Sequence, residues 1–117
     1  MRAEFVPTAA RHLVSLSVHI RPADAAEILA LGQFPFVALV ESWRASSFST
    51  TLLLDSGVAA CAGLVLEQGS ALGPRRAQVW LLTSKLVDVA PMSFHRAMKQ
   101  LRTLFFRLED AQCAVKK

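Results

Sequence analysis

The stretch TTLLLDSGVAACAGLVLE, residues 50–67, decides the fold class of this chain. It contains two apolar runs, 50–54 and 58–67, on either side of the tripeptide Asp-Ser-Gly at 55–57. Two apolar runs joined by so short a turn predict an antiparallel β-hairpin, because aspartate and glycine tolerate the backbone of tight turns. A glycine inside a strand often marks a bulge, so we expect one at Gly63.

A further strand is predicted at residues 77–83, AQVWLLT, after a loop that contains glycine and proline. Apolar side chains occupy both faces of this strand, which is typical of a strand in the centre of a sheet. A ten-residue connection, SKLVDVAPMS at 84–93, follows it. Over residues 94–108 apolar side chains recur at helical spacing and predict a long amphipathic helix. The second half of the chain is therefore predicted as a three-stranded meander followed by a helix.

Three elements are predicted before the hairpin. Residues 14–20, VSLSVHI, alternate between apolar and polar side chains, which favours a half-buried strand. Residues 24–32, DAAEILALG, have a capping-box-like start and a glycine stop, and residues 35–43 place a proline before an apolar stripe, so two helices are expected. The order strand, helix, helix, strand, strand, strand, helix predicts an α/β (α+β) domain with a mostly antiparallel sheet of about four strands.

Composition limits the class of protein further. At 117 residues the chain has the usual size of one domain, so a single domain over 1–117 is expected, and 53% hydrophobic against 19% charged residues excludes a disordered protein. The apolar run 58–66 has nine residues, whereas a membrane-spanning helix needs about 20, and no signal-peptide pattern opens the chain. We expect an intracellular protein that does not enter a membrane. Its two cysteines, Cys61 and Cys113, are expected to be reduced thiols.

Three short motifs resemble one known family. They are DAAEILALG at 24–32, ALVES at 38–42, and VWLLTS at 79–84 followed ten residues on by FHR at 94–96. Together they are similar to a GNAT-related family encoded by short-tailed bacteriophages, which includes an internal virion protein. The predicted order of elements also resembles the first half of the GNAT acyltransferase fold. The resemblance implies a C-terminally short GNAT-like fold, and a structural or assembly-associated phage protein of the virion or the host cytoplasm.

The same resemblance bears on catalysis. GNAT enzymes hold the pyrophosphate of coenzyme A with a glycine-containing loop between the fourth strand and the next helix, where backbone N–H groups face the phosphates. Here that connection, residues 84–93, contains no glycine, and the chain has no tyrosine to serve as the general acid common in GNAT enzymes. We therefore expect no cofactor and no catalysis, with an acetyl-CoA-dependent N-acetyltransferase as the alternative.

Five residues are candidates if the chain does bind a cofactor or catalyse a reaction. His95 could act as a general base, although a histidine at a helix start is more often a surface residue. Glu41, in the ALVES motif, could share that role or simply face solvent. Leu82, Thr83 and Ser84 could line a cofactor pocket, but hydroxyls at a strand end more often cap and turn the backbone.

Metal and nucleic acid are not expected as ligands. The histidines and cysteines show neither the C-x-x-C nor the H-x-x-x-H spacing of zinc sites. A basic set on the last helix and the tail could meet phosphates. It consists of Arg96, Lys99, Arg102, Arg107, Lys116 and Lys117. Glu109 and Asp110 interrupt this set and no aromatic residue is expected on its polar face, so a nucleic-acid-associated module is a further alternative.

The strand at residues 77–83 also predicts a partner. In a complete GNAT sheet this strand has a neighbour on its far side, and here the chain ends after the next helix. An apolar strand edge without a neighbour is a template for another chain. We therefore expect a homo-oligomer, or another phage protein docked along residues 77–83, with Leu81 buried.

Overall fold

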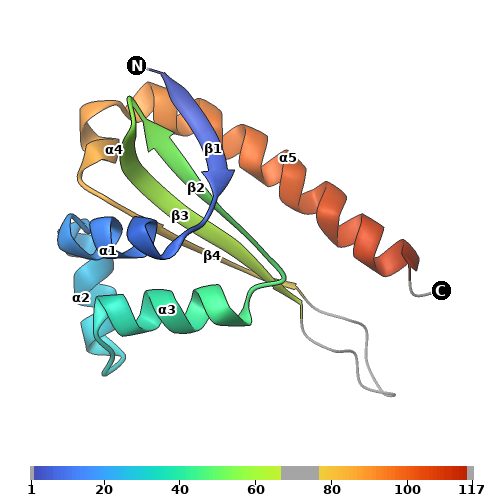
Figure 1. The fold of residues 1–117 in the computed structure, drawn as a ribbon, viewed down its shortest axis with the longest axis horizontal. Coiled ribbons are helices and arrows are strands. Elements are labelled where there is room, and N and C mark those ends of the chain that lie inside the picture. The colour runs from blue at the N-terminus through green and yellow to red at the C-terminus, as the bar shows by residue number, and fades with distance from the viewer. Residues whose placement is uncertain (1, 67–76, 116–117) are drawn as a thin grey trace.

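The computed structural model describes residues 2–66 and 77–115. These residues form an α+β fold in which a four-stranded antiparallel sheet, in the order β1-β2-β3-β4, lies between two layers of helix (Figure 1). Helices α1, α2 and α3 lie on one side of the sheet and α5 crosses the other. In chain order the described elements are β1 (Ala3–Pro7), α1 (Ala10–Val18), α2 (Pro22–Ala30), α3 (Pro35–Ala45), β2 (Phe48–Leu54), β3 (Gly57–Leu66), β4 (Ala77–Thr83), α4 (Leu86–Val89) and α5 (Pro91–Val115).

The predicted hairpin is formed by β2 and β3. Asp55 and Ser56 both have positive φ values, 47° and 69°, which is the backbone of a type I′ turn and matches the twist of the two strands. The bulge predicted at Gly63 is not there, because the register instead shifts between Leu52 and Leu53. Gly63 leaves room for a neighbour, since a Cβ at this position would overlap the indole nitrogen of Trp80.

The strand predicted at residues 14–20 is wrong, because most of this segment belongs to helix α1. The alternating serines fit a strand period, but Leu13 and Leu16 lie one helical turn apart and are buried against β3. The first strand is instead β1, which pairs with β2 so that Phe5 lies opposite Leu52. The observed order is therefore one strand, three helices, three strands and two helices in the described residues.

Helices α2 and α3 are where the sequence predicts them. Gly32, with a φ of 78°, follows the end of α2 and confirms the glycine stop. The start of α2 differs from the prediction, because the helix begins at Pro22 and the Asp24 side chain does not cap it. Asp24 instead accepts hydrogen bonds from Thr83 of β4, so this carboxylate joins the helix to the sheet.

The core has one part on each side of the sheet. Leu13, Leu16 and Leu39 from α1 and α3 pack on Cys61 of β3, with Trp80 of β4 at the margin. On the opposite side, α5 packs along β2 and β3 with a row of inward-facing side chains. This row consists of Ala97, Met98, Leu101 and Phe105.

Strand β4 has the predicted bounds but not the predicted central place. It is the end strand of the described sheet, and the strand it pairs with is β3, where Leu81 lies opposite Ala62. Just past its end, Ser84 forms an isolated bridge with Ile20. The β4 side chains Trp80 and Leu82 are covered by the helices, whereas Val79 and Leu81 are 58% and 40% exposed on the other side. The expected burial of Leu81 is therefore wrong for this chain alone, and β4 presents an apolar edge.

Candidate functional site

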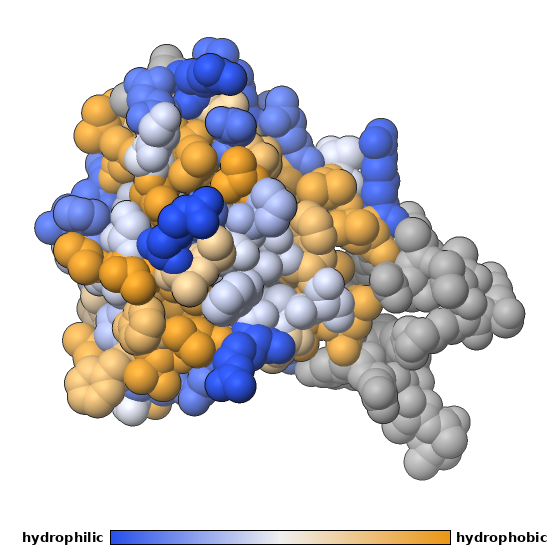
Figure 2. Space-filling view, in the orientation of Figure 1, coloured by the Kyte–Doolittle hydropathy of each residue, from blue (hydrophilic) through white to orange (hydrophobic). Residues whose placement is uncertain are grey.

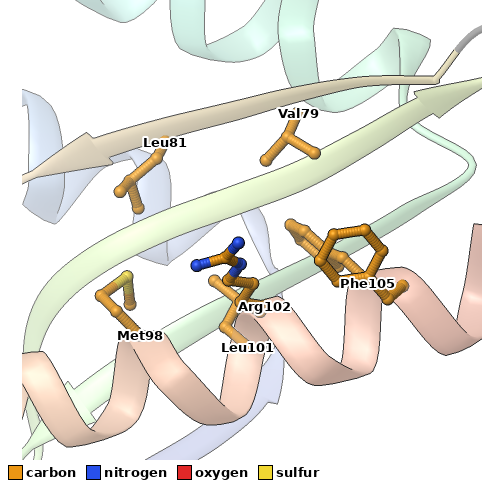
Figure 3. Close-up of a pocket in the computed structure, with 7 residues that line it drawn as sticks. Val79, Leu81, Met98, Leu101, Arg102 and Phe105 are labelled. Carbon is orange, nitrogen blue, oxygen red and sulfur yellow. The ribbon is translucent and has the colours of Figure 1, made fainter.

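A mostly apolar hollow lies between β4 and α5 (Figure 3). It is an open groove of about 290 Å³, which we call the edge groove. Its lining includes Val79, Leu81, Met98, Leu101, Arg102 and Phe105. Only one of these side chains is polar, so the groove suits an apolar occupant with one charged contact.

The backbone of β4 is open along the same groove. At Thr83 both outward backbone groups are used: the N–H donates to Asp24 Oδ2 at 3.0 Å, and the C=O accepts the Arg21 N–H at 3.0 Å. Outward-facing groups recur at every second residue of an edge strand, so the N–H and C=O of Leu81 and Val79 also point away from β3. Within the part of the chain that the structure describes, neither residue has a partner on that side.

Helix α5 supplies positive charge beside the edge groove. Between residues 91 and 108 it carries four Lys and Arg residues and no Asp or Glu. His95, Lys99, Arg102 and Phe106 follow one another at helical spacings of four, three and four, so they share one side of the helix. The Arg102 guanidinium lies 5.8 Å from the centre of the Phe106 ring, and no ion pair is found for it among the described residues.

One expectation about this helix is wrong. No aromatic residue was expected on the basic side, yet Phe106 is 55% exposed there, next to Arg102. The apolar stripe continues past the core because α5 packs on β2 and β3 and leaves the β4 side uncovered. The sequence does carry this signal, since two adjacent phenylalanines, Phe105 and Phe106, cannot both face one core.

The two candidate catalytic residues do not meet. His95 is exposed on α5 and Glu41 is exposed on α3, and these helices lie on opposite sides of the sheet. No acid–base pair can therefore form between them within one chain. Among residues 2–66 and 77–108, no group of three metal-ligating side chains gathers in one place.

The three candidate cofactor-binding residues have structural roles. Leu82 packs in the core beneath α1 and α3. The Thr83 hydroxyl donates to Asp24 Oδ2 at 2.8 Å, and the buried Ser84 hydroxyl donates to the Val58 C=O at 2.8 Å. Their hydroxyls hold the end of β4 to α2 and β3, so they are not free to bind a ligand.

The connection after β4 does not fit the pyrophosphate of coenzyme A. A phosphate nest needs several backbone N–H groups that have no other acceptor. Here the N–H groups of Ser84 and Lys85 donate to the C=O groups of Ala59 and His19, at 2.8 and 2.9 Å. The next three N–H groups are also used. Leu86 donates to Ser84 Oγ, and Val87 and Asp88 donate to the C=O groups of Ser84 and Lys85. A hollow of about 390 Å³ lies beside this connection, and the N–H groups of Ser84, Lys85 and Leu86 in its lining are already occupied.

A second exposed apolar surface lies at the turn between α2 and α3, the lower left of Figure 2. Leu31 and Phe34 are 77% and 72% exposed there, with Leu29, Phe36 and Val37 nearby in the chain. Of the helices described, none is by itself long and apolar enough to cross a bilayer; α2 and α3 qualify only as a pair bent by 82°.

The cysteine within the described side chains is not reactive in character. Cys61 is free and buried, and its Sγ lies 3.4 Å from Thr51 Oγ1. Burial raises the pKa of the Cys61 thiol, with the Thr51 hydrogen bond opposing this, so the thiol stays protonated at neutral pH. The prediction for Cys61 is confirmed, whereas the side chain of Cys113 lies outside the described residues.

No protein-family model, curated protein or solved structure matches this chain.

Proposed function

We propose that this chain is a non-catalytic binding module that docks another chain in the edge groove. It would serve as a structural or assembly-associated protein on a GNAT-like scaffold, in the virion or the host cytoplasm, as the resemblance to the phage family implies. The observation that carries the proposal is the unpaired edge of β4 beside an apolar groove, at Val79 and Leu81. An edge of this kind is a template for another polypeptide.

The order of elements supports the GNAT-like part of the proposal. β1 is followed by helices, then by the meander β2-β3-β4 and then by a long helix, with the strands side by side in chain order. This is the arrangement expected of the first half of a GNAT fold. The described residues add no strand beyond β4, where a complete GNAT sheet continues, and the edge groove lies at that point.

The hydrogen bonds after β4 support the non-catalytic part. Ser84, Lys85 and Leu86 use their N–H groups within the fold, so binding of a pyrophosphate would require breaking them. The alternative acetyltransferase also needs an acid–base group beside its acceptor, and His95 and Glu41 lie on opposite sides of the sheet.

Isothermal titration with acetyl-coenzyme A tests the non-catalytic part. The occupied amides predict no heat of binding at micromolar ligand, whereas an enzyme of this class would bind in that range. Micromolar binding of acetyl-coenzyme A to the folded protein would overturn the proposal, because the amides of the connection would then have left their partners within the fold.

Selection of peptides tests the docking part. A displayed library of random peptides of about nine residues, somewhat longer than an ordinary strand, is presented to the folded protein. Selected peptides should bind at least about tenfold more weakly to Leu81→Asp, which places a charge in the groove, and equally well to Phe34→Ala, an exposed aromatic elsewhere. Peptides that ignore Leu81→Asp would contradict docking in this groove.

Single-stranded nucleic acid is a second candidate ligand, favoured by the exposure of Phe106 beside Arg102, with Lys99 further along the same side of α5. A fluorescent oligothymidine of about 16 nucleotides would report it by anisotropy. Binding that weakens steeply with added salt and is lost in Phe106→Ala would support this candidate over peptide docking.

A further inference from the structure

We infer that the occupant of the edge groove is an extended strand of a different chain, apolar toward the groove and carrying carboxylates for α5. The inference rests on the proposed docking function and adds the form and the charge of the partner. It follows from three properties of the groove: its open backbone, its apolar floor and its basic wall.

The open backbone selects a strand over a helix. Val79 and Leu81 present N–H and C=O groups outward at the two-residue spacing of a strand. A helix satisfies its own backbone and would leave these groups unpaired, whereas an added strand pairs with them. Asp24 and Arg21 already occupy the outward groups of Thr83, so the added strand stops beside Leu81.

The apolar floor selects the side chains on one face of that strand. Val79 and Leu81 point to the α5 side, where Met98 and Phe105 continue the apolar surface (Figure 3). Side chains directly opposite each other on paired strands contact one another. The positions of the added strand that face the groove should therefore be valine, isoleucine, leucine or an aromatic residue.

The basic wall selects acidic residues and disfavours a second copy. Arg102 lines the groove, and Lys99 and His95 lie on the same side of α5, without an acidic residue from 91 to 108. A strand that covers the groove removes Arg102 from water, which is costly unless a carboxylate pairs with it. A second copy joined edge to edge brings the same basic helix to the interface, and like charges oppose that contact.

The peptide selection described above also tests this inference, through two pairs of variants. Val79→Pro removes the outward N–H, and because the β3 side of β4 is untouched, the variant should melt like the wild type. Selected peptides should bind it about tenfold more weakly than they bind Val79→Ala, which also loses the branched side chain but keeps the N–H. A second readout uses the wild-type protein and needs no variant. Bound peptide should slow hydrogen exchange at the Val79 and Leu81 amides.

Arg102→Gln and Arg96→Gln form the charge pair. Arg96 lies about 120° around α5 from Arg102, so only Arg102→Gln should weaken binding of acidic peptides, by about fivefold. The selected peptides should carry an apolar residue at every second position and should be enriched in Asp and Glu.

Three results would overturn the inference while leaving docking itself intact. In the first, peptides lose affinity for Leu81→Asp but keep it for Val79→Pro and do not slow hydrogen exchange at β4. In the second, the selected peptides contain no acidic residues. In the third, the chain forms a stable dimer that excludes peptide from the groove. Loss of Leu81 dependence would instead remove the docking function, so the two failures are distinguishable.

Discussion

At the scale of single residues, His12 is a titratable group whose protonation is opposed by its surroundings. It is buried at the start of α1, where its Nδ1 accepts the Ala9 N–H at 2.9 Å. Only an unprotonated ring nitrogen can accept this bond. Burial first, and the neighbouring charge of Arg11 second, lower the pKa of His12 from its ordinary value of 6.5.

Stability should therefore fall when His12 is forced to take up a proton. Because the pKa is lower in the folded chain, the unfolded chain binds more protons between the two values. The stabilising effect is complete above about pH 6.5 and is lost as the pH falls toward the folded pKa. Thermal melting from pH 8 to pH 5 should show this decline, and His12→Gln should flatten it while His19→Gln, at an exposed position, should not. Equal pH dependence in His12→Gln and the wild type would contradict the assignment.

Gly63 makes a second prediction at this scale. A methyl group at this position would meet the Trp80 indole, whose N–H donates to Ser46 Oγ at 2.6 Å. Gly63→Ala should therefore cost about 1–3 kcal/mol in the free energy of unfolding, measured with urea. The same change in a Trp80→Leu background should cost less, because the smaller side chain yields the space. Equal costs in both backgrounds would show that the indole is not the obstacle.

At the scale of elements, the Asp24 carboxylate joins α2 to the end of β4. It accepts the N–H and the hydroxyl of buried Thr83, at 3.0 and 2.8 Å. Asp24→Ala leaves both donors without an acceptor and should lower the free energy of unfolding, measured with urea, by about 1–3 kcal/mol. Glu27→Ala, at an exposed position on the same helix, should leave it nearly unchanged.

The Asp24 contact also bears on the edge groove. Asp24→Ala frees the outward N–H of Thr83 for an added strand, while the Thr83 C=O still accepts the Arg21 N–H. Hydrogen exchange at the Thr83 amide should become faster in this variant. Unchanged exchange together with unchanged stability would mean that the Asp24 contact contributes nothing.

Elements whose signals are local were predicted well. The turn at 55–57 carries its own backbone preference, so the hairpin follows from a few neighbouring residues. α3 and β4 likewise have a proline start or an uninterrupted apolar run, and β4 has the predicted bounds.

Elements whose signals depend on distant partners were predicted poorly. Residues 14–20 fit both a strand and a helix period, and the choice rests on packing against β3, far along the chain. β1 is short and ends in Pro7, so it becomes a strand only because β2 pairs with it. The occupied amides after β4 depend on Ala59 and His19, and no local pattern in the sequence announces those partners.

At the scale of the whole molecule, the two edges of the sheet differ in chemistry. β1 carries Glu4 and Pro7, a charge and a residue that cannot donate a backbone hydrogen bond, and both discourage pairing with other chains. β4 carries neither charge nor proline in AQVWLLT. One edge is therefore protected and the other is open, so association is directed to the side where the edge groove lies.

A charge on the open edge of β4 should affect association, whereas a charge in the core should affect folding, and two leucines of neighbouring strands test this difference. Leu81 is 40% exposed on β4, so an aspartate there can stay hydrated and the fold should survive, with a melting temperature close to that of the wild type. Leu64 is 1% exposed in the core beneath α5, and Leu64→Asp should abolish cooperative melting because its charge has no partner.

Association should respond in the opposite way. At high salt the like charges of α5 are screened and no longer oppose contact between two β4 edges. Leu81→Asp should then lower the tendency of the concentrated protein to aggregate, since an aspartate on the open edge would have to lose water, and light scattering against concentration measures this. Exposed Phe34→Ser provides the comparison, because it removes an apolar side chain at the α2–α3 turn and leaves β4 unchanged. If Phe34→Ser suppressed aggregation and Leu81→Asp did not, the α2–α3 turn would be the adhesive surface, and the open edge of β4 would have to be shielded in solution.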